Sequence, residues 1–128
     1  RAKDLGVSII AYSPLSQGLV SGKFHNNSML IKKRMKWHRY MKMQKQFSKE
    51  NLLKSSLVVD ELNKIAILHN ATPSQIALNW LIHFNGEMVF AIPGATKIKQ
   101  AVDNIDSIKI KLSSRDIDRL DVVSRKYK

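Results

Sequence analysis

The stretch that most constrains the fold of this chain is Val89–Asn104. It opens with a short continuous apolar run, Val89–Ile92, which is typical of a strand buried on both faces. Pro93 should end this strand, because proline has no N–H to donate to a sheet ladder. From Ile98 to Ile105 the apolar residues then recur with the period of an amphipathic helix. The stretch therefore predicts a strand, a turn and a helix.

The turn between this strand and this helix could bind an anion. Gly94 allows the backbone to bend tightly and to approach a ligand closely. Thr96 is expected to cap the helix by accepting a hydrogen bond from the amide of Ile98 or Lys99. Free amides and the positive dipole end of a helix attract phosphate groups, and Lys97 and Lys99 add two cations. From the residues alone, a phosphate site and an ordinary connection with surface lysines both remain open.

The rest of the chain alternates strand and helix signals. Residues 7–11 (VSIIA) are nearly all apolar and mostly β-branched, as in a buried strand. A helix is predicted over residues 51–70, with Asn70 as its left-handed stop. A second helix should begin at Pro73, because Thr72 and Gln75 have the spacing of a capping box. Ser113 is expected to cap a last helix. Buried strands separated by helices imply parallel strands and an α/β fold.

The loop after the first predicted strand offers polar side chains beside a turn-rich backbone. Tyr12 has a flat aromatic face and a hydroxyl group, and Ser13 and Ser16 carry small hydroxyl groups. Tyr12 can be read as a core-edge aromatic residue or as a platform for a ligand. His69 is interpreted as a helix-end histidine and not as a catalytic one.

Basic residues dominate the 128-residue chain, which has 22 Lys and Arg, 10 Asp and Glu, and a net charge of +12. Many of them lie in Lys32–Lys49, a run without acidic residues that also contains Trp37 and Tyr40. A basic and aromatic segment can bind nucleic acid or another polyanion. We favour a solvated, irregular insertion over residues 25–50, since charge runs are commonly solvated; a lid over a ligand is a third interpretation.

Composition also indicates in which cellular compartment the protein is expected. The chain has no cysteine, which excludes disulfides and cysteine-ligated metal and suits a cytoplasmic protein. It contains no 18-residue apolar run, so we expect no membrane span. The first residues carry no signal-peptide pattern, and Gly6 resembles the stop of a helix that is already ending. We therefore expect the sequence to be the C-terminal piece of something longer.

Four collinear motifs resemble the aldo-keto reductase family. Residues 11–24 (AYSPLSQGLVSGKF) are similar to its seventh-strand motif, and residues 71–82 (ATPSQIALNWLI) to the helix before its eighth strand. Residues 89–105 (VFAIPGATKIKQAVDNI) resemble its eighth strand and adenosine-phosphate loop, and residues 111–121 (KLSSRDIDRLD) its C-terminal helix. The resemblance implies that residues 1–128 are the last part of a (β/α)8 TIM barrel: two parallel strands, their helices and a C-terminal helix.

The resemblance also implies a cofactor, NADP(H), and an oxidoreductase that reduces carbonyl groups. Tyr12 would stack on the nicotinamide ring, and Lys97 would favour NADP(H) over NAD(H) through its positive charge. The family pattern assigns to the pyrophosphate Ser13, Leu15, Gln17 and Gly18. It assigns to the ribose 2′-phosphate Gly94, Thr96 and Lys97, and to the adenine end Gln100, Asp103 and Asn104.

One part of the family pattern has no counterpart in this sequence. The family's catalytic Asp, Tyr, Lys and His belong to earlier strands, so we assign no catalytic residue and no metal ligand here. A chain of this kind should have little or no activity alone. We expect it to be completed by a polypeptide that carries the N-terminal part of the barrel, or to self-associate, and to meet a carbonyl substrate only when completed.

Overall fold

A computed structural model describes residues 2–27, 29–34, 45–84, 86 and 88–127. Strands β1 (Ile9–Tyr12) and β2 (Val89–Ile92) form a two-stranded parallel sheet in which Ile9 lies opposite Val89. The predicted parallel pairing is confirmed. The first strand begins two residues later than predicted and includes Tyr12 as its last residue.

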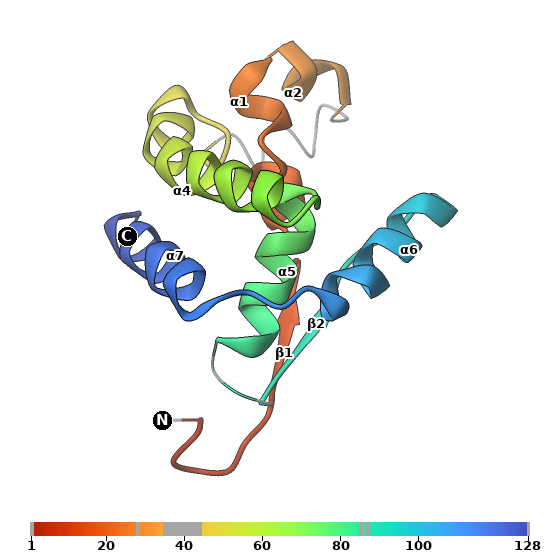
Figure 1. Ribbon diagram of the computed structural model, residues 1–128. Coiled ribbons are helices and arrows are strands. Elements are labelled where there is room, and N and C mark those ends of the chain that lie inside the picture. Colours follow the sequence, from red (N-terminus) through yellow and green to blue (C-terminus); the bar gives the residue numbers. More distant parts are fainter. Residues whose placement is uncertain (1, 28, 35–44, 85, 87, 128) are drawn as a thin grey trace.

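Helices make up most of the remaining described chain (Figure 1). Helices α1 and α2 occupy part of the segment 25–50 that the sequence predicts to be irregular, and residues 35–44, which hold much of the basic run, lie outside the described residues. Short 3-10 segments cover Ser16–Ser21 and Ser107–Lys109. The helices are α1 (Lys23–Asn26), α2 (Met29–Arg34), α4 (Lys49–Leu68), α5 (Pro73–His83), α6 (Ile98–Asp106) and α7 (Ser114–Lys126).

Local sequence signals place several helix ends. The capping box at the start of α5 is confirmed, because Thr72 Oγ1 accepts from the amide of Gln75 and Gln75 Oε1 accepts from the amide of Thr72. Ser113 caps α7 in the same way, with Asp116 as the reciprocal partner. Asn70 ends α4 in the left-handed region, with φ 49°, as predicted.

The main core lies between α4, α5 and α7. Ile65, Ile76 and Leu120, one from each helix, are almost completely buried, and Leu62 and Ala66 pack with them. A second cluster joins the loop after β1 to the segment before α4. Its centre is the edge-to-face pair of Phe24 and Phe47, whose ring centroids are 5.0 Å apart.

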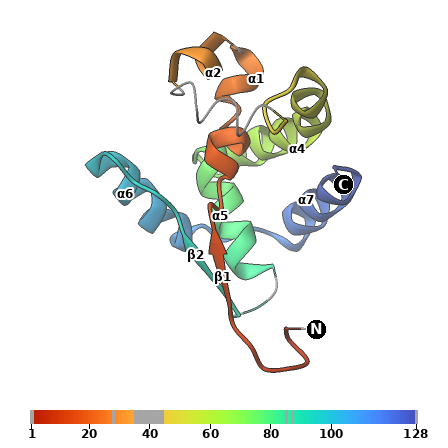
Figure 2. The ribbon, with the colours of Figure 1, turned by 180° about the vertical axis from the view of Figure 1, so that it is seen from behind.

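The sheet is covered on one face only. Helix α5 lies against one face, and the view from behind shows no described helix across the other (Figure 2). Val89 is buried, but Ile10, Phe90 and Ile92 are 68%, 58% and 52% exposed. The prediction that the strands are buried on both faces is therefore wrong for the described chain. Alternate residues of a strand point to opposite faces, and here only the α5 face has a covering layer.

Candidate functional site

A cavity of about 650 Å³ opens where β1 and β2 end. Its walls are the loop after β1, the first turn of α5, the loop after β2 and the α6 helix. The carboxyl ends of parallel strands share one edge of a sheet, so the two loops converge there although the sequence separates them widely. The cavity brings together all the predicted cofactor residues except Thr96 and Lys97, namely Tyr12, Ser13, Leu15, Gln17, Gly18, Gly94, Gln100, Asp103 and Asn104.

The loop after β1 has an unusual backbone. Ser13, Ser16 and Gln17 have φ angles of 53°, 47° and 57°, a region that residues other than glycine rarely occupy. Hydrogen bonds hold this conformation: Gln17 Nε2 donates to Ser13 Oγ at 2.9 Å, and the amide of Ser16 donates to the carbonyl of Ser13 at 2.8 Å. Such strain clusters at ligand sites, because a fixed loop presents its polar groups in one arrangement.

The two glycines of the predicted site differ in what they do. Gly18 has φ 91°, and a Cβ atom there would lie 3.4 Å from the ring of Phe24. Gly94 lies outside the left-handed region, and a Cβ atom there would meet nothing within 4 Å. The backbone conformation at Gly94 therefore does not itself require glycine. Its small size leaves open space on the cavity wall, which suits a closely approaching ligand.

The start of α6 also differs from expectation. Lys97, not Thr96, occupies the cap position. Gln100 Oε1 accepts from the amide of Thr96 at 2.8 Å, from its hydroxyl at 3.1 Å and from the amide of Lys97 at 3.2 Å. The prediction that the Thr96 hydroxyl caps the helix is wrong, because Lys97 stands at the cap position and the Thr96 hydroxyl is used as a donor to Gln100.

The positive charges near the cavity have different environments. Lys99 Nζ lies 3.0 Å from both carboxylate oxygens of Asp103, so its charge is already paired. Lys97 is exposed, forms no ion pair with any described residue and is not a wall residue of the cavity. Lys23, the first residue of α1, does line the cavity. Sequence reasoning missed Lys23, although its place directly after the loop glycines was a usable signal.

The first turn of α5 forms another wall that the sequence analysis treated only as a helix cap. Thr72, Pro73, Ser74 and Gln75 all line the cavity. Gln75 Nε2 also donates to the backbone carbonyl of Asp103 at 3.1 Å. This bond ties α5 to α6 and fixes the width of the cavity at that point.

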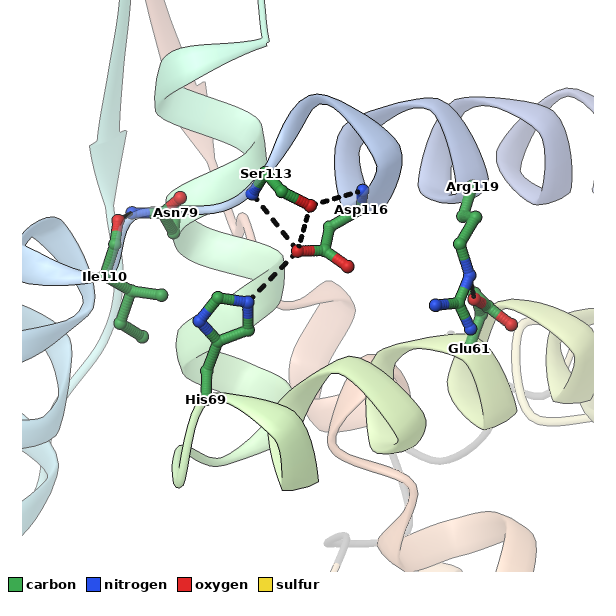
Figure 3. A network of polar contacts seen from close by, with 7 residues as sticks. All are labelled: Glu61, His69, Asn79, Ile110, Ser113, Asp116 and Arg119. Atoms are coloured by element: carbon green, nitrogen blue, oxygen red, sulfur yellow. Dashed lines mark hydrogen bonds and ion pairs between the residues drawn. The ribbon is translucent and has the colours of Figure 1, made fainter.

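A separate polar network joins α4 and α7 (Figure 3). His69 Nε2 lies 3.1 Å from Asp116 Oδ2, and the Ser113 hydroxyl donates to the same oxygen at 2.7 Å. Burial raises the pKa of Asp116, but the hydrogen bonds from Ser113 and His69 outweigh it, so this pKa lies below its usual value. None of these three residues lines the cavity. The network is a link between helices.

Two other kinds of feature are absent from the described ranges. No group of three or more His, Cys, Asp or Glu side chains gathers there in a way that could hold a metal ion. None of the described helices combines the length and apolar character needed to cross a membrane.

Comparison with known proteins identifies the family of the chain. The model of the Aldo/keto reductase family matches residues 1–125. "Probable aldo-keto reductase 1" of Glycine max is 36% identical over 115 residues, covering 90% of this chain and 31% of the relative. "Aldo-keto reductase str7" of Strobilurus tenacellus is 35% identical over 116 residues, covering 91% of this chain and 33% of the relative. The chain thus spans about a third of the length of these curated relatives, and it belongs to the aldo/keto reductase family of oxidoreductases.

Proposed function

We propose that the cavity at the ends of β1 and β2 binds NADP(H), and that the chain is the cofactor-binding part of a carbonyl-reducing oxidoreductase. The observation that carries the proposal is the convergence of two distant loops on one cavity of about 650 Å³. Its described walls combine hydroxyl, amide and backbone groups with the Lys23 ammonium, the chemistry that phosphate and ribose groups require.

Each wall of the cavity has its own role in the proposed binding of the cofactor. Tyr12, whose side chain is 82% exposed at the end of β1, offers its ring face to the nicotinamide. The fixed loop from Ser13 to Gly18 holds the pyrophosphate, and Lys23 supplies the opposing charge. Lys97, at the start of α6, reaches the ribose 2′-phosphate from outside the cavity. The bound cofactor would supply the hydride; the residues of this chain bind and orient it.

We further infer that β1 and β2 are neighbouring strands of an eight-stranded barrel. Their parallel pairing, the helical layer on one face and the apolar, exposed opposite face support this inference. Hydride transfer to a carbonyl also needs a proton donor beside the carbonyl oxygen. In this proposal Tyr12 serves the cofactor, so reduction depends on residues beyond these 128 and the chain alone is inactive.

A calorimetric titration of the 128-residue chain with NADPH, and then with NADH, tests the cofactor proposal. We expect saturable 1:1 binding that is tighter for NADPH. Circular dichroism on the same sample establishes that the helices are formed. Absence of heat with either nucleotide, in a chain with the expected helical spectrum, would overturn the proposal.

A further inference from the structure

The short helix α1 contacts both the cavity and α4. Its first residue, Lys23, is exposed and lines the cavity. His25 lies two positions later, and side chains two positions apart on a helix point to nearly opposite sides. Accordingly, the ring of His25 faces α4, where its Nε2 atom lies 2.8 Å from Ser55 Oγ. The contact of His25 with α4 therefore helps to fix the direction in which Lys23 points.

The position of α1 depends on such tertiary contacts. A helix of 4 residues forms too few internal hydrogen bonds to be stable on its own. Gly22, directly before α1, approaches α4 so closely that a Cβ atom there would lie 3.1 Å from Val59 Cγ1. The hydrogen bond between His25 and Ser55 adds a polar contact between the same two helices. Loss of this bond should therefore let α1 move, and Lys23 with it.

The hydrogen bonds of Ser55 define which nitrogen of His25 carries the proton. The Ser55 hydroxyl donates to the carbonyls of Asn51 and Leu52, at 2.8 and 3.2 Å, and it has a single proton to give. Its oxygen therefore accepts from His25, so Nε2 carries a hydrogen and Nδ1 a lone pair. Nδ1 is buried and, within the described chain, has no hydrogen-bond partner. A proton on Nδ1 would thus bury a charged N–H group without an acceptor, which costs free energy.

The charged groups near His25 offset this cost only in part. The charge of Asp60, on α4, raises the pKa of His25, but burial lowers it by more, so this pKa lies below its usual value. The 3-10 segment Ser16–Ser21 also contacts α1 and has no charged residue. Helix α2 contacts α1 as well, and its sequence contains three cations, at residues 32–34, and no acid. Protonation therefore favours release of the His25 ring from its place against α4.

We propose that His25 is a positioning residue for the cofactor site: its neutral ring holds α1 against Ser55 and so directs Lys23 into the cavity, and its protonation weakens cofactor binding. This inference rests on the proposed NADP(H) site and adds a pH-dependent control to it. Affinity for the cofactor should fall as the pH drops below about 6.5. The 2′-phosphate of the cofactor takes up a proton near pH 6 as well, so the part due to His25 is the difference between wild type and a variant that lacks this ring.

Calorimetric titration of the 128-residue chain with NADP⁺ at pH 8 and at pH 5 tests the proposal. The oxidised cofactor is used because it is stable in acid. Between these pH values, the dissociation constant of wild type should rise about fivefold more than that of His25→Gln, since glutamine can keep the hydrogen bond to Ser55 without titrating. His83→Gln, at an exposed position on α5, should behave as wild type. Circular dichroism at both pH values establishes that each variant is folded.

Lys23→Met tests whether the proton on His25 acts through Lys23. This variant should bind NADP⁺ more weakly at pH 8, and its affinity should change with pH no more than that of His25→Gln.

Hydrogen exchange follows α1 in the absence of cofactor. The amide of Asn26 donates to the carbonyl of Gly22 at 3.4 Å, within the turn that His25 holds against α4. The protection of this amide, relative to its intrinsic exchange rate, should decrease about threefold from pH 7 to pH 5 in wild type. In His25→Gln it should stay constant.

The possible failures are distinguishable. Absence of NADP⁺ binding at both pH values would refute the proposed cofactor site and this inference with it. Binding whose pH dependence is the same in wild type and in His25→Gln would overturn only the role of His25. A pH dependence that Lys23→Met retains in full would also overturn that role, because the proton would then act elsewhere. Constant protection of Asn26 in wild type would show that protonation leaves α1 in place, and would contradict the proposal as well.

Discussion

The side-chain amide of Asn79 donates a 2.8 Å hydrogen bond to the backbone carbonyl of Ser107, 28 residues later in the chain. Both residues are almost completely buried. The same amide also donates to the carbonyl of Ile110 at 2.8 Å (Figure 3). One side chain of α5 thus fixes the connection between α6 and α7, and through it both the cavity wall and the main core.

Replacing Asn79 should therefore destabilise the whole chain. Asn79→Leu keeps a similar volume but leaves the carbonyls of Ser107 and Ile110 without their donors, at a cost of about 2–4 kcal/mol in the free energy of unfolding. Urea denaturation followed by circular dichroism measures the change. Asn63→Leu, on the partly exposed side of α4, is the matched control. A loss no larger than that of the control would show that the two bonds contribute little.

The pH dependence of stability should report on Asp116. Its pKa lies below the usual value, so the ionised carboxylate stabilises the fold above the unfolded pKa of about 3.9. This stabilisation is lost as the pH falls through the lower, folded-state pKa. Asp116→Asn should cost about 1–2 kcal/mol near pH 5, and the difference from wild type should shrink toward pH 2. Urea midpoints over this range measure it. Asp118→Asn, exposed on the same helix, should show no such trend.

Substitutions of the lysines near the cavity should affect NADPH binding and NADH binding differently. Lys23 lines the cavity, so Lys23→Met should weaken NADPH and NADH alike, by about tenfold. Lys97 lies at the start of α6 outside the cavity wall, so Lys97→Met should weaken NADPH alone by a similar factor. Lys126→Met, at an exposed position near the end of α7, is the control. Equal effects of Lys97→Met on both nucleotides would contradict its assignment to the 2′-phosphate.

Local signals made the helices and the site loops predictable. The cap residues Thr72 and Ser113 act on amides three positions away, so a few letters of sequence are enough to identify them. The parallel pairing of the strands follows from the helices between them. The convergence of both loops on one cavity then follows from that pairing together with the family resemblance.

Other features depend on contacts that spacing does not reveal. Periodicity identified the apolar face of α6 but not whether anything covers it, so Ile98 and Val102 are exposed against expectation. At the start of α6, only the structure shows that Lys97 stands at the cap position and that the Thr96 hydroxyl donates to Gln100. The role of Asn79 has no local sequence signal, because the carbonyls that accept its hydrogen bonds lie 28 and 31 positions away.

His25 should cause a second pH dependence of stability, at a higher pH than that of Asp116. Its Nε2 atom lies 2.8 Å from Ser55 Oγ, and within the described chain its buried Nδ1 atom has no hydrogen-bond partner. Burial lowers the pKa of His25, and the nearby charge of Asp60 raises it only in part.

The unfolded chain therefore binds a proton at His25 more readily than the folded chain does. Stability should fall as the pH drops from about 7 toward the folded-state pKa, below the usual value of about 6.5. His25→Gln can keep a hydrogen bond to Ser55 without titrating, so its urea midpoint should fall less than that of wild type between pH 7 and pH 5. His83→Gln, at the exposed end of α5, should follow wild type. If the His25→Gln and wild-type curves run parallel, His25 has the same pKa in the folded and unfolded chains, and its burial has no electrostatic cost.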